Sequence, residues 1–77
     1  MEKQELEKIV VELVRETADV DTVSLSMDLM DDVGLSSIDV MDLIAKCETA
    51  FSVKISARDL RRIYTVQDLA DLIEGRQ

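Results

Sequence analysis

Two adjacent hydroxyl side chains, Ser36 and Ser37, are the residues of this chain with the clearest potential for covalent chemistry. They follow Gly34, which permits a tight turn, and they precede a helical apolar pattern that begins near Ile38. A serine at a helix start can cap backbone N–H groups. It can also carry a phosphoester, because the helix N-terminus favours an anion by about 0.3–1 kcal/mol. On the motif alone, capping and modification both remain open.

The other potentially reactive side chains do not form a catalytic or metal-binding set. The chain has no His, so neither serine nor Cys47 has the usual general base beside it. Cys47 is the only cysteine and lies on an apolar helical stripe, so we expect a buried core residue without a disulfide. The acidic segment 28–32 has Met30 and Val33 where a calcium-binding EF-hand needs a polar ligand and a glycine. We therefore expect neither an enzyme nor a metal site.

Acidic residues dominate the charge, with 17 against 9 basic residues and a formal net charge of −8. Between Arg15 and Lys46 there is no base, and this interval contains all of the following acids: Glu16, Asp19, Asp21, Asp28, Asp31, Asp32, Asp39 and Asp42. Such a surface repels nucleic acid and anionic lipid, so we expect a protein partner with a basic docking surface. No signal segment and no membrane-spanning apolar run is evident, which favours the cytoplasm and no membrane insertion.

Helical periodicity predicts a first helix over about residues 2–17 and a second over 37–51. The core stripe of the first comprises Leu6, Ile9, Val10, Leu13 and Val14. That of the second comprises Val40, Leu43, Ile44, Cys47 and Phe51. The long connection between them has no helical period, but its apolar residues should pin it to the helices: Val20, Val23, Leu25, Met27, Leu29, Met30, Val33 and Leu35.

Three capping boxes mark helix starts, each a Ser or Thr followed three residues later by Asp. They begin at Ser36, Ser56 and Thr65. The second should open a short helix with Ala57, Leu60 and Ile63. The third should open a helix with Val66, Leu69, Ala70 and Ile73, which Gly75 closes. We therefore predict an all-α fold, a small bundle of three main helices plus one short helix with a long first loop, in a single monomeric domain over residues 1–77.

The segment Gly34-Leu35-Ser36-Ser37-Ile38-Asp39 resembles the Gly-x-Asp-Ser-Leu signature of acyl and peptidyl carrier proteins. The resemblance extends along nearly the whole chain, through Asp28-Leu29, the second helix ending at Phe51, Val53-Lys54-Ile55-Ser56 and Thr65-Val66-Gln67-Asp68-Leu69. It implies an acyl-carrier-like bundle that bears a covalent 4′-phosphopantetheine arm. Ser37 matches the serine that receives this arm from coenzyme A, by its spacing from Gly34 and because Ile38 corresponds to the signature's Leu.

The implied function is to hold acyl groups as thioesters and deliver them to enzymes of fatty-acid, polyketide or related biosynthesis. The implied partners are a phosphopantetheinyl transferase and acyl-loading and acyl-processing enzymes. The chain departs from the family where Ser36 replaces the usual Asp before the modified serine. Two other functions therefore stay open: an aminoacyl or peptidyl carrier, and an unmodified helical interaction module that keeps the fold.

A second stripe on the predicted helix 37–51 consists of Ile38, Met41 and Ala45, flanked by Asp39, Asp42 and Glu48. By resemblance, this stripe would dock the basic surface of a partner enzyme, with the carboxylates steering the encounter. The competing interpretation is that Ile38 and Met41 pack against the long loop. A further departure from fatty-acid carriers is the basic cluster Arg58, Arg61 and Arg62. We interpret it as serving ordinary solubility and pairing with nearby carboxylates, with selection among partners as the alternative.

Overall fold

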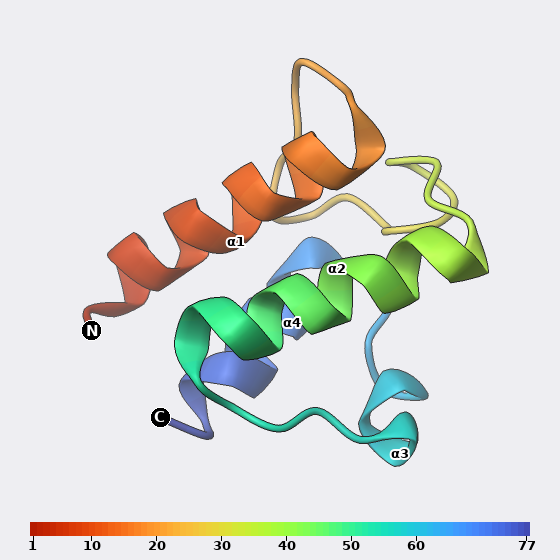
Figure 1. Ribbon diagram of the computed structural model, residues 1–77. Helices are drawn as coiled ribbons and strands as arrows, with labels where there is room; N and C mark the ends of the chain where they lie inside the picture. Colours follow the sequence, from red (N-terminus) through yellow and green to blue (C-terminus); the bar gives the residue numbers. More distant parts are fainter.

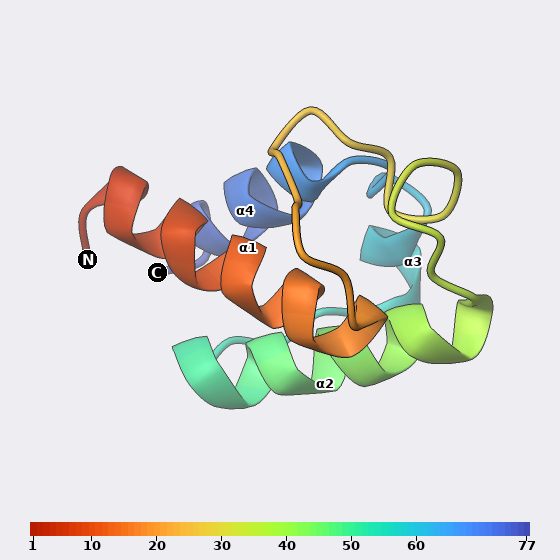
Figure 2. The ribbon, with the colours of Figure 1, turned by 90° about the horizontal axis from the view of Figure 1, so that it is seen from above.

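The structure, a computed structural model, describes residues 1–77 and consists of four helices without a β-strand. They are α1 (Lys3–Ala18), α2 (Ser37–Phe51), α3 (Ala57–Leu60) and α4 (Val66–Glu74). Helix α1 packs against both α2 and α4, and it runs antiparallel to α2 (Figure 1). The turned view shows α1 between these two helices and both chain ends at one end of the bundle (Figure 2). The predicted all-α bundle is confirmed.

The predicted helix boundaries hold with one exception. Helix α2 has the expected bounds, α1 is displaced by one residue from the expected 2–17, and all three capping boxes form with both of their hydrogen bonds. The exception is α3, which was expected to include Ile63 but ends at Leu60. There the N–H groups of Arg61 and Arg62 turn back to the carbonyls of Arg58 and Asp59, in tight turns that do not continue the α-helix.

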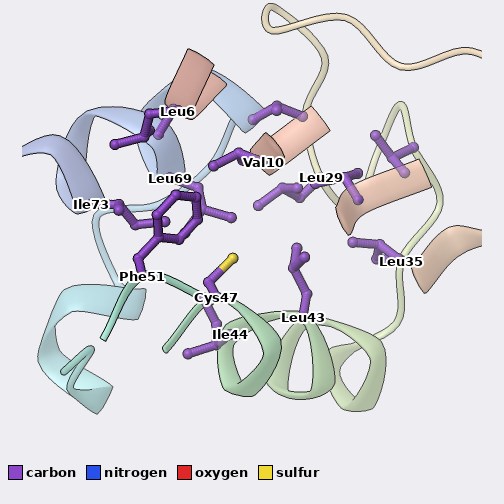
Figure 3. Packing of buried hydrophobic residues seen from close by; sticks show 14 residues of the cluster. Leu6, Val10, Leu29, Leu35, Leu43, Ile44, Cys47, Phe51, Leu69 and Ile73 are labelled. Carbon is purple, nitrogen blue, oxygen red and sulfur yellow. The ribbon is translucent and has the colours of Figure 1, made fainter. Parts of the chain in front are cut away.

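The core contains only hydrophobic side chains, and they come from α1, α2, α4 and the long loop. The fully buried positions follow the predicted stripes: Leu6, Val10 and Val14 on α1, Leu43, Ile44, Cys47 and Phe51 on α2, and Val66, Leu69, Ala70 and Ile73 on α4. Figure 3 shows Leu43 and Cys47 pointing from α2 into this interior. Helix α3 contributes no buried residue, and only its last residue, Leu60, packs against the core as a partly buried side chain.

The connection between α1 and α2 is pinned to the bundle by apolar side chains, as predicted. Leu29, Val33 and Leu35 are buried, and Val23, Leu25 and Met27 pack against the core as partly buried residues. Met30 is a correction to the prediction, because half of its surface (50%) is exposed. Its backbone N–H donates to Asp28 Oδ1 in a local turn, which leaves the thioether at the surface.

The same loop is joined by backbone hydrogen bonds to the segment that leads into α4. Leu29 N donates to the Tyr64 carbonyl at 2.8 Å, and Val66 N donates to the Met27 carbonyl at 3.0 Å. At the end of the loop, Gly34 adopts φ +91°, a conformation that side chains with a Cβ rarely take. This turn delivers the chain to the first residue of α2, which is Ser37.

Candidate functional site

The two adjacent serines have different surroundings. Ser36 is the N-cap of α2, and its hydroxyl accepts the N–H of Asp39 at 3.2 Å while Asp39 Oδ2 accepts the N–H of Ser36 at 3.0 Å. Ser37 is exposed, and its hydroxyl has no hydrogen-bond partner in the chain. The N–H groups of Ser37 and Ile38 also lack acceptors, as is usual in a first helical turn. The hydroxyl of Ser36 is therefore occupied by capping, and that of Ser37 is free.

An apolar pocket of about 300 Å³ opens beside Ser37. Seven of its nine lining residues are hydrophobic. It is lined by Ser37, Val40 and Met41 of α2, by Leu60, Ile63 and Tyr64 of the α3 segment, and by Asp28, Leu29 and Met30 of the long loop. A larger depression of about 630 Å³ lies near Arg76, but only two of its seven lining residues are hydrophobic and Ser37 is not among them. The smaller pocket is therefore the one that belongs to the serine.

Sequence reasoning missed most of this pocket. Leu60 and Ile63 were interpreted as core residues of a helix, and Tyr64 was not singled out. No sequence signal separated them from a helical stripe, because Leu60 and Ile63 are three residues apart, although the helix ends at Leu60. Leu60 and Ile63 are half-buried and Tyr64 is 65% exposed, so they form a wall open to solvent on one side.

Polar contacts hold this wall in place. Arg76, near the C-terminus, contacts both carboxylate oxygens of Asp59, with Nη2 donating to Oδ1 at 2.7 Å, and its Nη1 also donates to the Lys54 carbonyl at 3.0 Å. Glu48 of α2 accepts the N–H of Ile55 at 2.9 Å. Hydrogen bonds from the Arg76 guanidinium, and then from the backbone N–H of Ser56, hold the pKa of Asp59 far below its usual 3.8.

Four of the six expected docking residues are exposed, and the carboxylates of the other two form hydrogen bonds with the backbone. Ile38 is 81% exposed and Met41 is 66% exposed, so neither is covered by the long loop. Asp42 is exposed and pairs with Lys46 at 3.2 Å. Ala45 is exposed but lies outside the pocket. Ile38, Met41 and Asp42 are thus available to a partner near Ser37.

Asp39 and Glu48, which were expected to flank the docking stripe, have structural contacts instead. Asp39 completes the capping box of α2, and the backbone N–H of Ser36 lowers its pKa below the usual 3.8. Glu48 is half-buried and bonded to the backbone after α2. Both carboxylates therefore serve the fold, although their charges still add to the acidic field of α2.

The basic cluster Arg58, Arg61 and Arg62 is exposed, and none of its members forms an ion pair within 4.0 Å. The expected pairing with nearby carboxylates is thus not what the structure contains. Asp59, the acid within this segment, is bound by Arg76 from the C-terminal end. The three guanidinium groups are left free on the surface of the pocket's α3 wall.

Cys47 is fully buried, as predicted, and burial raises the pKa of its thiol to about 12.

No group of three or more His, Cys, Asp or Glu side chains is arranged to hold a metal ion. None of the four helices combines the length and the apolar character needed to cross a membrane. The carboxylate of Asp28 accepts the N–H groups of Met30 and Asp31, which accounts for one of the loop acids.

Known proteins resemble this chain along most of its length. The family model described as the phosphopantetheine attachment site matches residues 8–73. An acyl carrier protein of Coprothermobacter proteolyticus is 35% identical over 72 residues, covering 94% of this chain and 85% of the relative. That of Micrococcus luteus is 32% identical over 77 residues, covering 97% and 95%. An acyl carrier protein structure from Thermotoga maritima matches with a TM-score of 0.80 at 31% identity, covering 99% of this chain and 91% of the other.

The family's cofactor is a covalently attached 4′-phosphopantetheine, and its members are carriers that work with biosynthetic enzymes and are not enzymes themselves. The exposed serine at the start of α2, with an apolar pocket beside it, suits such a group. The family model matches residues 8–73, and the two relatives align over 85% and 95% of their own length. This chain therefore belongs to the acyl carrier protein family.

Proposed function

We propose that Ser37 Oγ is the attachment point of 4′-phosphopantetheine in this carrier. The observation that carries the proposal is the contrast within the serine pair: the Ser36 hydroxyl accepts the N–H of Asp39, whereas the Ser37 hydroxyl is exposed and unbonded. Ser37 also lines the apolar pocket, and Ser36 does not. A phosphodiester on Ser37 would lie next to the free N–H groups of Ser37 and Ile38, where an anion is stabilised by about 0.3–1 kcal/mol.

The modification itself is a phosphoryl transfer to the Ser37 hydroxyl. Its Oγ forms a bond to the phosphorus of coenzyme A that bears pantetheine, and the bond from that phosphorus to the oxygen bridging the nucleotide phosphate breaks. Adenosine 3′,5′-bisphosphate leaves. The hydroxyl proton passes to a base of the transferase, because this chain has no His to take it. When bound, the arm supplies a terminal thiol that holds acyl groups as thioesters.

The pocket supports an aliphatic acyl group as the cargo. Seven of its nine lining residues are hydrophobic, and its volume of about 300 Å³ is at the lower end of ordinary ligand pockets. An aminoacyl thioester would bring a charged α-ammonium, but the only charged residue in the lining, Asp28, already accepts the N–H groups of Met30 and Asp31. These features favour an acyl cargo over an aminoacyl or peptidyl one.

The partners that fit this surface are a phosphopantetheinyl transferase and enzymes that load and process acyl groups. Ile38 and Met41 supply exposed apolar contact beside Ser37, and Asp42 with the other acids of the loop and α2 supplies a steering field. A monomeric single-domain carrier over residues 1–77 in the cytoplasm is consistent with one buried, unreactive thiol and with the single core.

The test is intact mass after incubation of the unmodified chain with coenzyme A and a broad-specificity phosphopantetheinyl transferase. We expect a gain equal to one arm for the natural chain and for Ser36→Ala, and none for Ser37→Ala. Ser36→Ala removes a helix cap, at a cost of about 0.5–2 kcal/mol, so circular dichroism should confirm that each variant is folded. A gain that survives Ser37→Ala would overturn the proposal.

Ser36→Asp sharpens the same test. Aspartate caps a helix as well as serine does, so α2 should keep its start. The substitution also places a carboxylate next to Ser37, as in the family signature. We expect the modification rate to rise while the modified position stays at Ser37. An unchanged rate would mean that the transferase does not use the residue at position 36.

A further inference from the structure

The pocket beside Ser37 lies between two walls of opposite charge. On one side, Val40 and Met41 line the pocket, and the acids Asp39 and Asp42 flank them on α2. In the long loop, Asp31 and Asp32 follow directly after pocket-lining Met30 and are exposed. We call Asp31, Asp32, Asp39 and Asp42 the acidic wall. Lys46, paired with Asp42, is the only cation in contact with it.

The other wall is basic. Arg61 and Arg62 lie between Leu60 and Ile63, both of which line the pocket, and Arg58 precedes them by one turn. We call Arg58, Arg61 and Arg62 the basic wall. Figure 1 and Figure 2 both place α3 beside the N-terminal half of α2, so the acidic and the basic residues lie on neighbouring segments that both contribute to the pocket lining.

The cations of the basic wall have no counter-charge within the chain. Four of the other six cations do, since Lys3, Arg15, Lys46 and Arg76 each form an ion pair with a carboxylate, whereas Lys8 and Lys54 do not. The acid closest in sequence to the basic wall, Asp59, is neutralised by Arg76. In a chain with a formal net charge of −8, three free guanidinium groups within five residues leave a local positive field.

We propose that the basic wall is a docking surface for carboxylates of the enzyme that acts at Ser37, and that this enzyme presents bases to the acidic wall and acids to the basic wall. The proposal rests on the proposed function, because the partner is taken to approach the arm site. A uniformly basic enzyme surface would be attracted by α2 but repelled by α3. The charge boundary across the pocket mouth therefore fixes the orientation of the partner and selects against uniformly basic ones.

The defined probe is a phosphopantetheinyl transferase whose docking surface is uniformly basic, titrated into the ¹⁵N-labelled, unmodified full chain. To find the transferase bases that face α3, a cross-linker is attached to the cysteine of the Arg61→Cys variant, since buried Cys47 will not react. In a second version of the transferase, the bases identified in this way are replaced with glutamate. We expect the natural chain to bind the glutamate-bearing transferase about tenfold more tightly than the original, and R58E/R61E/R62E to reverse that preference.

The matched control compares Arg61→Glu with Lys8→Glu, an exposed α1 cation without an ion pair, because both change the net charge equally. If the two variants shift the Kd for the original transferase equally, only net charge matters and the proposal is overturned. The titration uses the unmodified chain, so the measured Kd reports on the docking surface even if Ser37 is not the modified residue. Intact mass of the same samples reports on that separate question.

Discussion

Helices α2 and α3 border the same pocket but are held in different ways. Helix α2 has 15 residues and buries four side chains, including Leu43 and Cys47. Helix α3 has four residues and buries none. Its half-buried Leu60 and the following Ile63 pack against the edge of the core, and the Arg76–Asp59 ion pair, its own capping box and the bond from Ile55 to Glu48 add polar contacts. One wall of the pocket is part of the core, and the other is joined to it by partly buried side chains and polar contacts.

This difference suits a carrier whose cargo must enter and leave. Separating α2 from the bundle would expose four buried side chains, whereas displacing α3 would expose only partly buried ones, Leu60 and Ile63, and break a few polar contacts. Ser37 lies on the fixed wall, so its position does not depend on whether the pocket is open. Local opening of α3 can thus occur without global unfolding.

The largest expected effect comes from truncating the fixed wall. Leu43→Ala removes a fully buried side chain and should lower the free energy of unfolding by about 2–5 kcal/mol. Leu60→Ala, on the half-buried α3 wall, should cost clearly less. Urea denaturation followed by circular dichroism measures both. Equal losses for the two variants would mean that α3 is as much a part of the core as α2.

A smaller effect, on partner recognition, should follow from a charge at the exposed end of α2. Met41→Glu puts a carboxylate where an apolar contact is expected, and kcat/KM with the transferase should fall about tenfold, or 1.4 kcal/mol. The side chain is 66% exposed, so the free energy of unfolding should stay within about 0.5 kcal/mol. Thr49→Glu, an exposed α2 position outside the pocket, is the control. If both variants lose activity alike, the docking face has been misplaced.

Removing the fastening of α3 should have a local effect. Arg76→Gln loses the ion pair with Asp59, so amide hydrogen exchange of residues 60–63 should accelerate several-fold while that of α2 is unchanged. Arg15→Gln, which removes an ion pair within α1, should leave α3 unaffected. Exchange measured by NMR distinguishes the two. Unchanged exchange at residues 60–63 in Arg76→Gln would show that the ion pair does not restrain α3.

The smallest effect concerns acid titration. Asp59 and Asp39 both have a pKa below the usual 3.8, so each stabilises the fold fully at higher pH, and this contribution is lost as pH falls below 3.8 toward the folded-state pKa. Carboxyl-carbon NMR should find Asp59 titrating at the lower pH of the two, because only Asp59 contacts Arg76. In Arg76→Gln, the pKa of Asp59 should rise toward 3.8. If the pKa of Asp59 is unchanged in Arg76→Gln, the ion pair with Arg76 is not the cause of its low value.

Local signals in the sequence predicted most of the fold. Each capping box is complete within four residues, so Ser36, Ser56 and Thr65 marked helix starts that the structure reproduces. The ends of α1 and α2 were predicted to within one residue from their apolar stripes alone, since the C-caps Asp19 and Ser52 adopt left-handed conformations without glycine. No composition signal announces such a C-cap in a non-glycine residue.

The candidate site was only partly predictable, because its second wall depends on contacts distant in sequence. Ser37 could be selected from the resemblance to the carrier signature, and Met41 and Asp42 from their positions on one helix. The bond between Arg76 and Asp59 joins residues 17 positions apart, and the loop reaches Tyr64 through its backbone. Neither has a periodic pattern. The bond of Glu48 to the backbone of Ile55 was not foreseen for the same reason, since Ile55 lies beyond the end of α2.

The most direct test of the central claim is fragmentation mass spectrometry of the natural, unmutated chain after reaction with coenzyme A and the transferase. The capping bond of Ser36 and the free hydroxyl of Ser37 predict that peptide fragments separating the two serines will place the whole arm on Ser37. An arm on Ser36, or a chain that remains unmodified while a family member reacts fully beside it, would contradict the claim.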